Sequence, residues 1–298
     1  MRYLVTGAAG FIGTHLVNEL LKKRENIVYG IDRKKIKIQN KRLIKIKKDI
    51  KLFKKFPTVD YVFHLAAYNG TKFFYSKPFE IIDDNISTTI KLLQFYKNIR
   101  LKKFISAGSS EIYAGLQNQS KKSINHTEQQ KIIFSDIKNP RWSYATSKFL
   151  SEIAVINSGI PYIIIRYFNV YGPKQKDHFI PEFVERVKRK KFKVFGGKNT
   201  RSFIFVKDAV DASIKLSTKK IKNEIFNLGS NKESKIIDVA KLILNILNIK
   251  KKKIKILSAP HGSVLRRKPS IKKLEKVIGN FNKTSLKKGL KQTLGIKL

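Results

Sequence analysis

The sequence contains no cysteine in its 298 residues. This absence excludes a disulfide framework, an iron–sulfur centre, a zinc site built on thiolates and catalysis by a thiol nucleophile. The sequence also lacks any uninterrupted apolar run of about 18 residues, so it gives no indication of a membrane-spanning helix. Its start, MRYLVTGAAG, is typical of a buried strand and a glycine-rich turn, not of a secretory signal. We therefore expect a soluble, cytoplasmic globular protein.

Acidic residues are scarce as well. Only 21 Asp and Glu accompany 64 Lys and Arg, which gives a formal net charge of +43 at pH 7. Such an excess raises the question of a nucleic-acid partner. However, only twelve of the basic residues are arginines, and the lysines occur in almost every segment. A nucleic-acid surface more often concentrates arginine, aromatic residues and glycine on one face. We expect no specific nucleic-acid partner and no membrane partner.

Metal ligands are sparse too, because the five histidines show no metal-ligand spacing. We expect no metal site. His64 is interpreted as a packed structural histidine, and the acidic pair Asp83 and Asp84 as solvated surface.

Apolar residues, at 42% of the chain, are numerous enough for a sizeable core. Short apolar runs alternate with amphipathic stretches, a pattern typical of βα units around a mostly parallel sheet. The expected strands are 3–5, 27–32, 43–46, 59–63, 104–106 and 163–165, and the expected helices are 11–23, 78–98 and 144–155.

The pattern is less regular after residue 173. Short strands are expected at 193–195, 203–206 and 225–228, and helices at 180–189, 208–217, 234–247 and 284–294. The sequence predicts an α/β fold, with a Rossmann-type doubly wound parallel sheet and a smaller C-terminal substrate-binding lobe. In such open sheets, ligands bind at the carboxyl edge of the strands.

A glycine motif, residues 6–13, follows the first expected strand and opens a helix. Its glycines allow a tight turn, a close approach to a pyrophosphate and close helix packing, and the helix N-terminus favours phosphate. Asp32, at the end of the second strand, is placed to bind an adenosine ribose and favours NAD over NADP, although Arg33 and Lys34 beside it reduce that preference. The cofactor-binding residues expected here are Gly7, Gly10, Phe11, Ile12, Gly13, Asp32 and Arg33.

A second signal is the pair Tyr144 and Lys148, which share one face of an expected helix because they lie four residues apart. An ammonium and a positively charged nicotinamide near a phenol lower its pKa, so that such a tyrosine can take a proton from a sugar hydroxyl. Ser109, at the end of another strand, completes the expected catalytic group.

With these motifs the chain resembles the extended short-chain dehydrogenase/reductases, in the NAD-dependent nucleotide-sugar epimerase/dehydratase family. The matching segments are 6–13, 49–50, 64–67, Asn85, 109–113, Tyr144 with Lys148, 166–173, 179–181, 201–208, 227–229 and 267–271. The resemblance implies an NAD-binding Rossmann domain in residues 1–172 and 200–228. It implies a nucleotide-sugar-binding lobe in residues 173–199 and 229–298.

The resemblance also implies roles for single residues. Tyr144 is the catalytic base, Lys148 binds the nicotinamide ribose and lowers the tyrosine pKa, and Ser109 binds the reacting hydroxyl. The further cofactor contacts implied are Asp49 and Ile50 at the adenine, Leu65, Ala66 and Ala67 along the cofactor, and Tyr167 at the nicotinamide. The substrate diphosphate is assigned to Asn169, Arg201 and Arg267, where an arginine fork can bond two oxygens.

Glu111 leaves the outcome of the reaction open. Once hydride has left C4 of the sugar, the 4-keto group acidifies the C5 proton, which a carboxylate can remove for elimination of water. In nucleotide-glucuronate decarboxylases, which also carry Glu at this position, the β-keto acid loses carbon dioxide instead. Residues 141–144 and 267–271 are similar to decarboxylase sequences as well.

We therefore expect an NAD-dependent epimerase/dehydratase that acts through transient C4 oxidation of a nucleoside-diphosphate sugar. The alternatives are a nucleotide-glucuronate decarboxylase, an NAD(P)H-dependent 4-keto-sugar reductase and, more remotely, a non-catalytic relative that binds RNA or a partner. A homodimer is expected through the helices that begin near Phe79 and Tyr144. Their apolar faces carry Ile82, Ile86, Ile90, Leu93, Phe149, Leu150 and Ile153.

Overall fold

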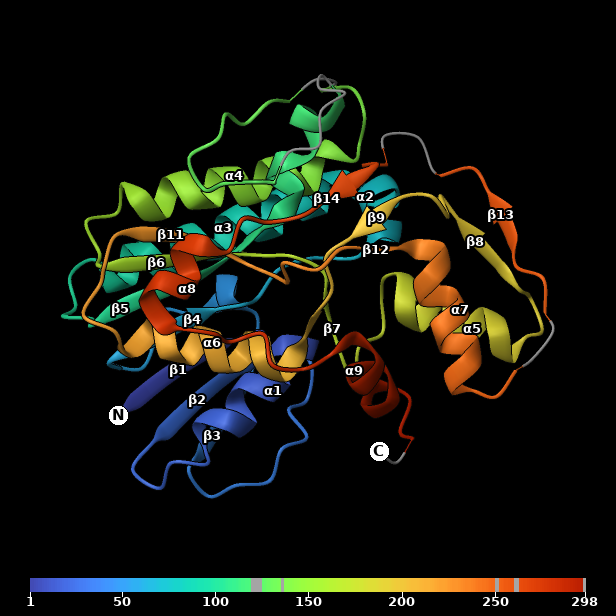
Figure 1. Ribbon diagram of the computed structural model, residues 1–298. Coiled ribbons are helices and arrows are strands. Elements are labelled where there is room, and N and C mark those ends of the chain that lie inside the picture. The colour runs from blue at the N-terminus through green and yellow to red at the C-terminus, as the bar shows by residue number, and fades with distance from the viewer. Residues whose placement is uncertain (119–124, 135–136, 250–251, 260–262, 297–298) are drawn as a thin grey trace. The chain divides into compact units, whose positions relative to one another are not determined.

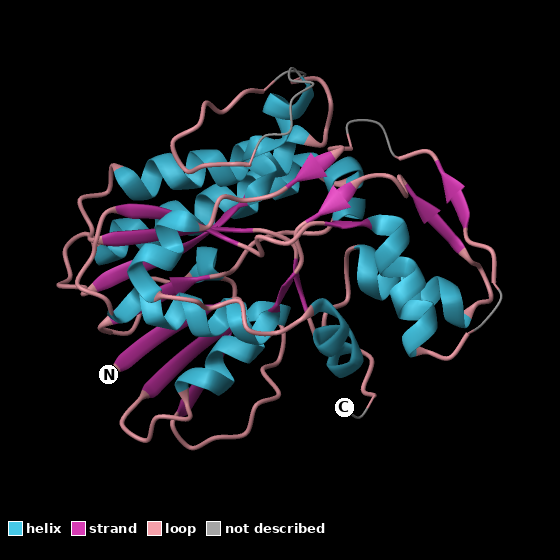
Figure 2. Cartoon of the chain, in the orientation of Figure 1, coloured by secondary structure: helices cyan, strands magenta, loops and turns pink. Residues whose placement is uncertain are grey.

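Seven strands form the main sheet, in the order β11-β6-β5-β4-β1-β2-β3, in a computed structural model that describes residues 1–118, 125–134, 137–249, 252–259 and 263–296 (Figures 1 and 2). Neighbouring strands from β1 to β6 all pair in parallel. The strands are β1 (Arg2–Thr6), β2 (Ile27–Asp32), β3 (Leu43–Lys47), β4 (Tyr61–His64), β5 (Lys103–Ser109), β6 (Tyr162–Tyr167) and β11 (Glu224–Leu228). The expected Rossmann-type doubly wound sheet is confirmed.

The strand order reverses between β1 and β4. Crossovers between parallel strands are right-handed, so the connections that run in opposite directions from this point place their helices on opposite faces of the sheet. The helices and 3₁₀ turns of this part are α1 (Phe11–Leu20), η1 (Ile50–Leu52), α2 (Thr71–Ser76), α3 (Pro78–Tyr96), η2 (Ser110–Asn118), α4 (Trp142–Ile156) and α6 (Val206–Thr218). Figure 1 shows α3 and α4 on one face and α1 on the other. A crevice for a ligand is expected at this reversal point.

The core of this face explains why α3 and α4 lie against the sheet. Leu92 and Val155, from the two helices, pack with strand residues such as Leu4 and Phe104 in one buried cluster. The polar contacts between the two helices are also buried, since Asn85 Nδ2 donates to Ser147 Oγ at 2.9 Å. Helix α4 is thereby fixed against β5 and β6, and this contact sets the position of the residues it carries.

The chain divides into two compact units. The first contains Met1–Ile112, Pro140–Tyr167 and Val210–Phe226, and the second contains Tyr113–Asn139, Phe168–Ala209 and Asn227–Leu298. The assignment of the chain to a cofactor domain and a substrate lobe, with the boundaries given above, stays a prediction.

The second unit consists of short strands and amphipathic helices. Strand β9 (Thr200–Arg201) lies between β12 (Ser234–Lys235) and β14 (Arg266–Arg267), while β7 (Val170–Tyr171) pairs with β10 (Ile204–Phe205) and β8 (Lys193–Phe195) with β13 (Lys255–Leu257). Its helices are α5 (Phe179–Lys188), α7 (Ile236–Ile246), α8 (Lys272–Ile278) and α9 (Leu286–Thr293).

The expected elements differ from the observed ones mainly at their ends. The helix expected at 11–23 ends at Leu20, and Val206, expected at the end of a strand, is the first residue of α6. Helices α2 and α8 were not expected, because they are too short to show a full amphipathic period. No helix in the described ranges is both long and apolar enough to cross a membrane.

Candidate active site

The glycine turn after β1 is shaped by what its glycines lack. Gly7 has φ +69°, and a Cβ added to it would lie 2.8 Å from the backbone nitrogen of Ala66. A Cβ at Gly13 would overlap the carbonyl oxygen of Gly7. Gly10 is the N-cap of α1, whose first N–H groups have no partner within the helix. The turn therefore brings exposed backbone and the positive end of a helix together, and both fit the pyrophosphate of a dinucleotide. Phe11 and Ile12 form the first turn of this helix.

Asp32 lies at the end of β2 and faces this turn. Its Oδ2 accepts a hydrogen bond from the Ala9 N–H at 2.9 Å, and its Oδ1 accepts one from the Lys34 N–H at 2.8 Å. Each carboxylate oxygen keeps further lone pairs, so Asp32 can still accept from the hydroxyls of a ribose. The position of Asp32 fits the expected ribose contact.

Arg33, next to Asp32, is held by two carboxylates of the protein itself. Its Nη1 and Nη2 donate to the two oxygens of Asp84 at 2.8 and 2.9 Å, and its Nε lies 2.9 Å from Asp49. The interpretation of Asp83 and Asp84 as solvated surface is wrong for Asp84, whose side chain is only 13% exposed. Sequence reasoning missed this residue because its partners lie 51 and 33 positions away in the chain.

The other cofactor contacts implied by the resemblance lie on neighbouring loops of the first unit. Asp49 caps η1 by accepting from the Lys51 N–H at 2.9 Å, and Ile50 behind it is buried. The segment that follows β4 includes Leu65, Ala66 and Ala67, and the Ala66 N–H donates to Thr6 Oγ1 at 3.2 Å. The segment after β4 is thus tied to the glycine turn.

Ser109, Tyr144 and Lys148 are brought together at the carboxyl end of β5, and all three are buried. Burial raises the pKa of Tyr144, while a hydrogen bond from the Ser109 hydroxyl lowers it and the charge of Glu111 raises it. The Ser109 oxygen accepts from the Glu111 N–H at 3.2 Å, which leaves the hydroxyl proton for the phenol. The residue that favours the phenolate in the protein alone is therefore Ser109.

The resemblance implies that Lys148 lowers the pKa of Tyr144. In the structure, burial of Lys148 decides the pKa of its own ammonium group. Its Nζ donates to the Ala107 carbonyl of β5 at 2.9 Å. Burial lowers the pKa of Lys148 to about 8, and the charge of Glu152 opposes that change. Lys148 thus remains largely protonated at neutral pH, close to the end of β5.

Glu152 forms a buried ion pair behind Lys148. Its Oε2 accepts from Arg166 Nε at 3.1 Å and from Nη2 at 2.8 Å, and both side chains are almost fully buried. Gly108, which pairs with Arg166 in the sheet register, leaves room for the pair, since a Cβ there would lie 2.5 Å from Glu152 Oε1. Sequence reasoning missed Glu152, although its spacing of four residues from Lys148 places both on one helical face.

Glu111 and Arg141 form a second ion pair near the end of β5, with Nη2 and Oε2 3.0 Å apart. Both side chains are mostly buried, and a hydrogen bond to Tyr75 also contributes to the raised pKa of Arg141. Glu111 thus holds Arg141 with its side chain, while its backbone N–H donates to Ser109 Oγ. It forms a charged group in the same unit as Ser109 and Tyr144.

The ring of Phe74, in α2, stacks on the ring of Tyr144 with centroids 4.9 Å apart and an angle of 14°. Phe74 is buried and fixes the plane of the phenol. Phe74 stands in a run of three aromatic residues, Phe73-Phe74-Tyr75, and the structure shows that its ring contacts Tyr144.

Tyr167 and Asn169 lie on either side of the unit boundary. The hydroxyl groups of Tyr167 and Ser213 lie 2.8 Å apart in the first unit, and burial raises the pKa of Tyr167 to about 12. In the second unit, Asn169 Nδ2 donates to the Ser202 carbonyl at 3.3 Å.

The two arginines expected at the diphosphate are neighbours in the second unit. Arg201 of β9 is the register partner of Arg267 of β14 in a parallel pair. Arg267 is buried, and its charge helps burial to lower the pKa of the nearby His126 to about 4. Two cations on adjacent strands fit an anionic group with several oxygens.

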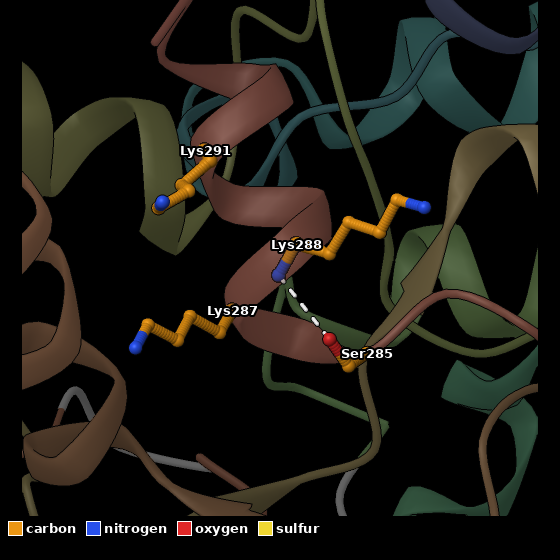
Figure 3. Close-up of a pocket in the computed structure, with 4 residues that line it drawn as sticks. All are labelled: Ser285, Lys287, Lys288 and Lys291. Atoms are coloured by element: carbon orange, nitrogen blue, oxygen red, sulfur yellow. Dashed lines mark hydrogen bonds between the residues drawn. The ribbon is translucent and has the colours of Figure 1, made fainter. Parts of the chain in front are cut away.

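The structure also contains a hollow that is not lined by the expected site residues. This hollow, on α9, is lined by Ser285, Lys287, Lys288 and Lys291, none of which belongs to the expected site (Figure 3). Among the described residues, no group of three or more His, Cys, Asp or Glu is arranged to hold a metal ion.

Comparison with known proteins shows the family of this chain. The family model described as "NAD dependent epimerase/dehydratase family" matches residues 3–229. The chain is 34% identical to a UDP-N-acetyl-alpha-D-glucosaminuronate decarboxylase of Bacillus cytotoxicus, covering 98% of this chain and 96% of that protein. It is 31% identical to a UDP-glucuronate 4-epimerase of Thermodesulfobacterium geofontis, covering 98% and 94%.

Among solved structures, the fold is similar to that of UDP-glucuronic acid 4-epimerase from Bacillus cereus in complex with UDP-glucuronic acid and NAD. The TM-score is 0.86 at 29% identity, and the match covers 99% of this chain and 98% of that one.

The Glu152–Arg166 pair gives a stability prediction. Arg166→Met leaves a buried carboxylate without its donors, and we expect the free energy of unfolding to fall by about 4 kcal/mol at pH 7. Burial raises the pKa of Glu152 and Arg166 lowers it, so removal of Arg166 raises that pKa further. The folded variant then binds a proton more strongly than the unfolded chain, and its stability is fully present below about pH 4 and falls as the pH rises toward neutrality.

Urea unfolding of the Arg166→Met variant at about pH 4 and at pH 7 measures this pH dependence of the free energy of unfolding. The double variant Glu152→Gln with Arg166→Met carries no buried charge at this position and is expected to lose the added pH dependence. An Arg166→Met variant equally destabilised at both pH values would contradict the argument.

Proposed function

Because the chain belongs to the NAD-dependent epimerase/dehydratase family, we propose that it oxidises C4 of a nucleoside-diphosphate sugar transiently, with Tyr144 as the base. The observation that carries the proposal is the burial of Ser109, Tyr144 and Lys148 together at the carboxyl end of β5. This edge of the sheet also holds the glycine turn of Gly7 and Gly13.

The family membership confirms the expected enzyme class and NAD as the cofactor. The first turn of α1 and the glycine turn would hold the pyrophosphate, and Asp32 would hold the adenosine ribose. When bound, NAD supplies the acceptor for the hydride that leaves C4 of the sugar.

The chain's own side chains handle the proton. The phenolate of Tyr144 takes the proton of the C4 hydroxyl, and the hydrogen bond from Ser109 stabilises the phenolate. Lys148, held at Ala107 and close to the negative charge of Glu152, supplies a fixed positive charge on the same helix face. Phe74 keeps the phenol in one plane. Arg201 and Arg267, register partners within the second unit, stay the predicted contacts of the diphosphate.

The Glu111–Arg141 pair favours a substrate that carries a carboxylate at C6. A guanidinium has five N–H donors, so Arg141 can donate to a substrate carboxylate as well as to Glu111. Oxidation at C4 makes such a substrate a β-keto acid, which loses carbon dioxide readily. The relatives described above include a decarboxylase and two 4-epimerases named for UDP-linked hexuronic acids, so we assign a nucleotide hexuronic acid as the substrate class.

The chain forms a homodimer through α3 and α4. Phe79, Ile90 and Ile153 on these helices are 76%, 40% and 40% exposed, which leaves apolar area for a partner. Leu93 does not belong to this face, because it is buried in the core of the first unit.

Substitution of the base tests the proposed reaction. Tyr144→Phe keeps the ring stacked on Phe74 but removes the proton acceptor, so we expect turnover of a UDP-linked hexuronic acid with NAD to fall at least about 100-fold. The product is followed by mass spectrometry, and NAD binding is expected to be preserved. The control is Tyr29→Phe, a partly buried tyrosine in β2 that has no role in the proposed site. Unchanged turnover in the Tyr144 variant would overturn the mechanism.

The dimer has its own test. Ile153→Lys places a charge on the proposed interface, and light scattering during gel filtration is expected to show a monomer where the unaltered chain is a dimer. Ile256→Lys, on the exposed strand β13 of the second unit, is the matched control and is expected to remain dimeric. Equal masses for the two variants would contradict an interface on α4.

A further inference from the structure

Two neighbouring acidic residues on α3, Asp83 and Asp84, share Lys51 as a partner but differ in their other contacts. Asp84 receives Arg33 through both guanidinium nitrogens, at 2.8 and 2.9 Å, and Lys51 Nζ at 2.8 Å. Asp83 receives Lys51 Nζ at 2.8 Å and the Ser87 hydroxyl at 2.8 Å. Of these two acids, only Asp84 holds Arg33.

The position of Arg33 makes this contact consequential. Arg33 directly follows Asp32, the residue proposed to hold the adenosine ribose. In this fold, a cation at that place accommodates the 2′-phosphate that distinguishes NADP from NAD. Arg33 donates from Nη1 and Nη2 to Asp84, and its Nε lies beside Asp49, so its guanidinium is already bound by protein carboxylates.

We propose that Asp84 is a specificity-determining residue, which favours NAD over NADP by holding Arg33 away from a 2′-phosphate. This inference rests on the proposed cofactor site and adds to it a residue outside the glycine motif and the β2 end. Asp32 and Asp84 then act on the same choice in two ways, since Asp32 repels a phosphate directly and Asp84 occupies the cation that would attract it.

The electrostatics of the contact agree with this role. The hydrogen bond from Arg33 lowers the pKa of Asp84, so the carboxylate stays charged at neutral pH and keeps its hold on the guanidinium. Half of the Arg33 side chain is exposed, so the arginine can turn to a ligand once Asp84 is neutral. Arg33 is not part of the hydrophobic core, because its partners are the carboxylates of Asp49 and Asp84 and half of its side chain is exposed.

The experiment compares Asp84→Asn with Asp83→Asn, which removes the same charge from the same helix without releasing Arg33. NAD and NADP are titrated into each protein by calorimetry at one fixed ionic strength, because exposed ion pairs are screened by salt. Asp84→Asn is expected to tighten NADP binding about fivefold relative to NAD. Asp83→Asn is expected to leave the ratio of the two affinities unchanged.

A second variant assigns the gain to Arg33. Arg33→Met added to Asp84→Asn is expected to abolish the increase in NADP affinity, and thermal melting shows that each variant is folded. The proposal is overturned if Asp84→Asn weakens both nucleotides equally, if Asp83→Asn gives the same gain, or if the gain persists without Arg33. Because binding is measured without a sugar, failure of the proposed function, which is unchanged turnover in the Tyr144 variant, and failure of this inference remain distinguishable.

Discussion

The proposed active site depends on the packing of α4 against the end of β5, and that packing depends on a balance of buried charge. Lys148 is a buried cation on α4, and Glu152, one helical turn away, is a buried anion held by Arg166 of β6. A buried charge without a partner is costly, so these three groups stabilise one another only as a set. Gly108 of β5, which has no side chain, leaves the space that Glu152 and Arg166 occupy. The same contact places Tyr144 beside Ser109, where a proton can be moved.

The chain has a net charge of +43 and few acidic residues, and in the structure several of these acidic residues form ion pairs with arginines. The carboxylates of Asp49, Asp84, Glu111 and Glu152 each hold an arginine. Asp49 and Asp84 share Arg33, and the three arginines held, Arg33, Arg141 and Arg166, lie close to residues with proposed roles in cofactor binding or catalysis. Acidic side chains in this protein therefore decide which cations remain available to an anionic ligand. Most of the lysine excess, by contrast, lies outside the motifs of the sequence and gives no information about the substrate.

Much of the fold follows from local sequence signals. The strands from β1 to β6, the helices α1, α3 and α4, and the glycine turn were predicted because each has a clear apolar period or a steric requirement. Tyr144, Lys148 and Ser109 were predicted because their spacing and strand-end positions carry chemical meaning. The two-residue strands β7, β9, β12 and β14 were missed, since two residues show no period, whereas β10 lies within the strand expected at 203–206. The partners of Arg33 and the stacking of Phe74 on Tyr144 were missed because they join segments far apart in sequence.

The central claim is that the reaction starts with removal of hydrogen from C4 by the site built around Tyr144. A single-turnover comparison of UDP-linked hexuronic acids carrying deuterium at C4 or at C5 tests it most directly, with the product followed by mass spectrometry. The account predicts that deuterium at C4 slows product formation and is absent from the oxidised sugar. A rate that is unaffected by deuterium at C4, but slowed by deuterium at C5, would contradict it.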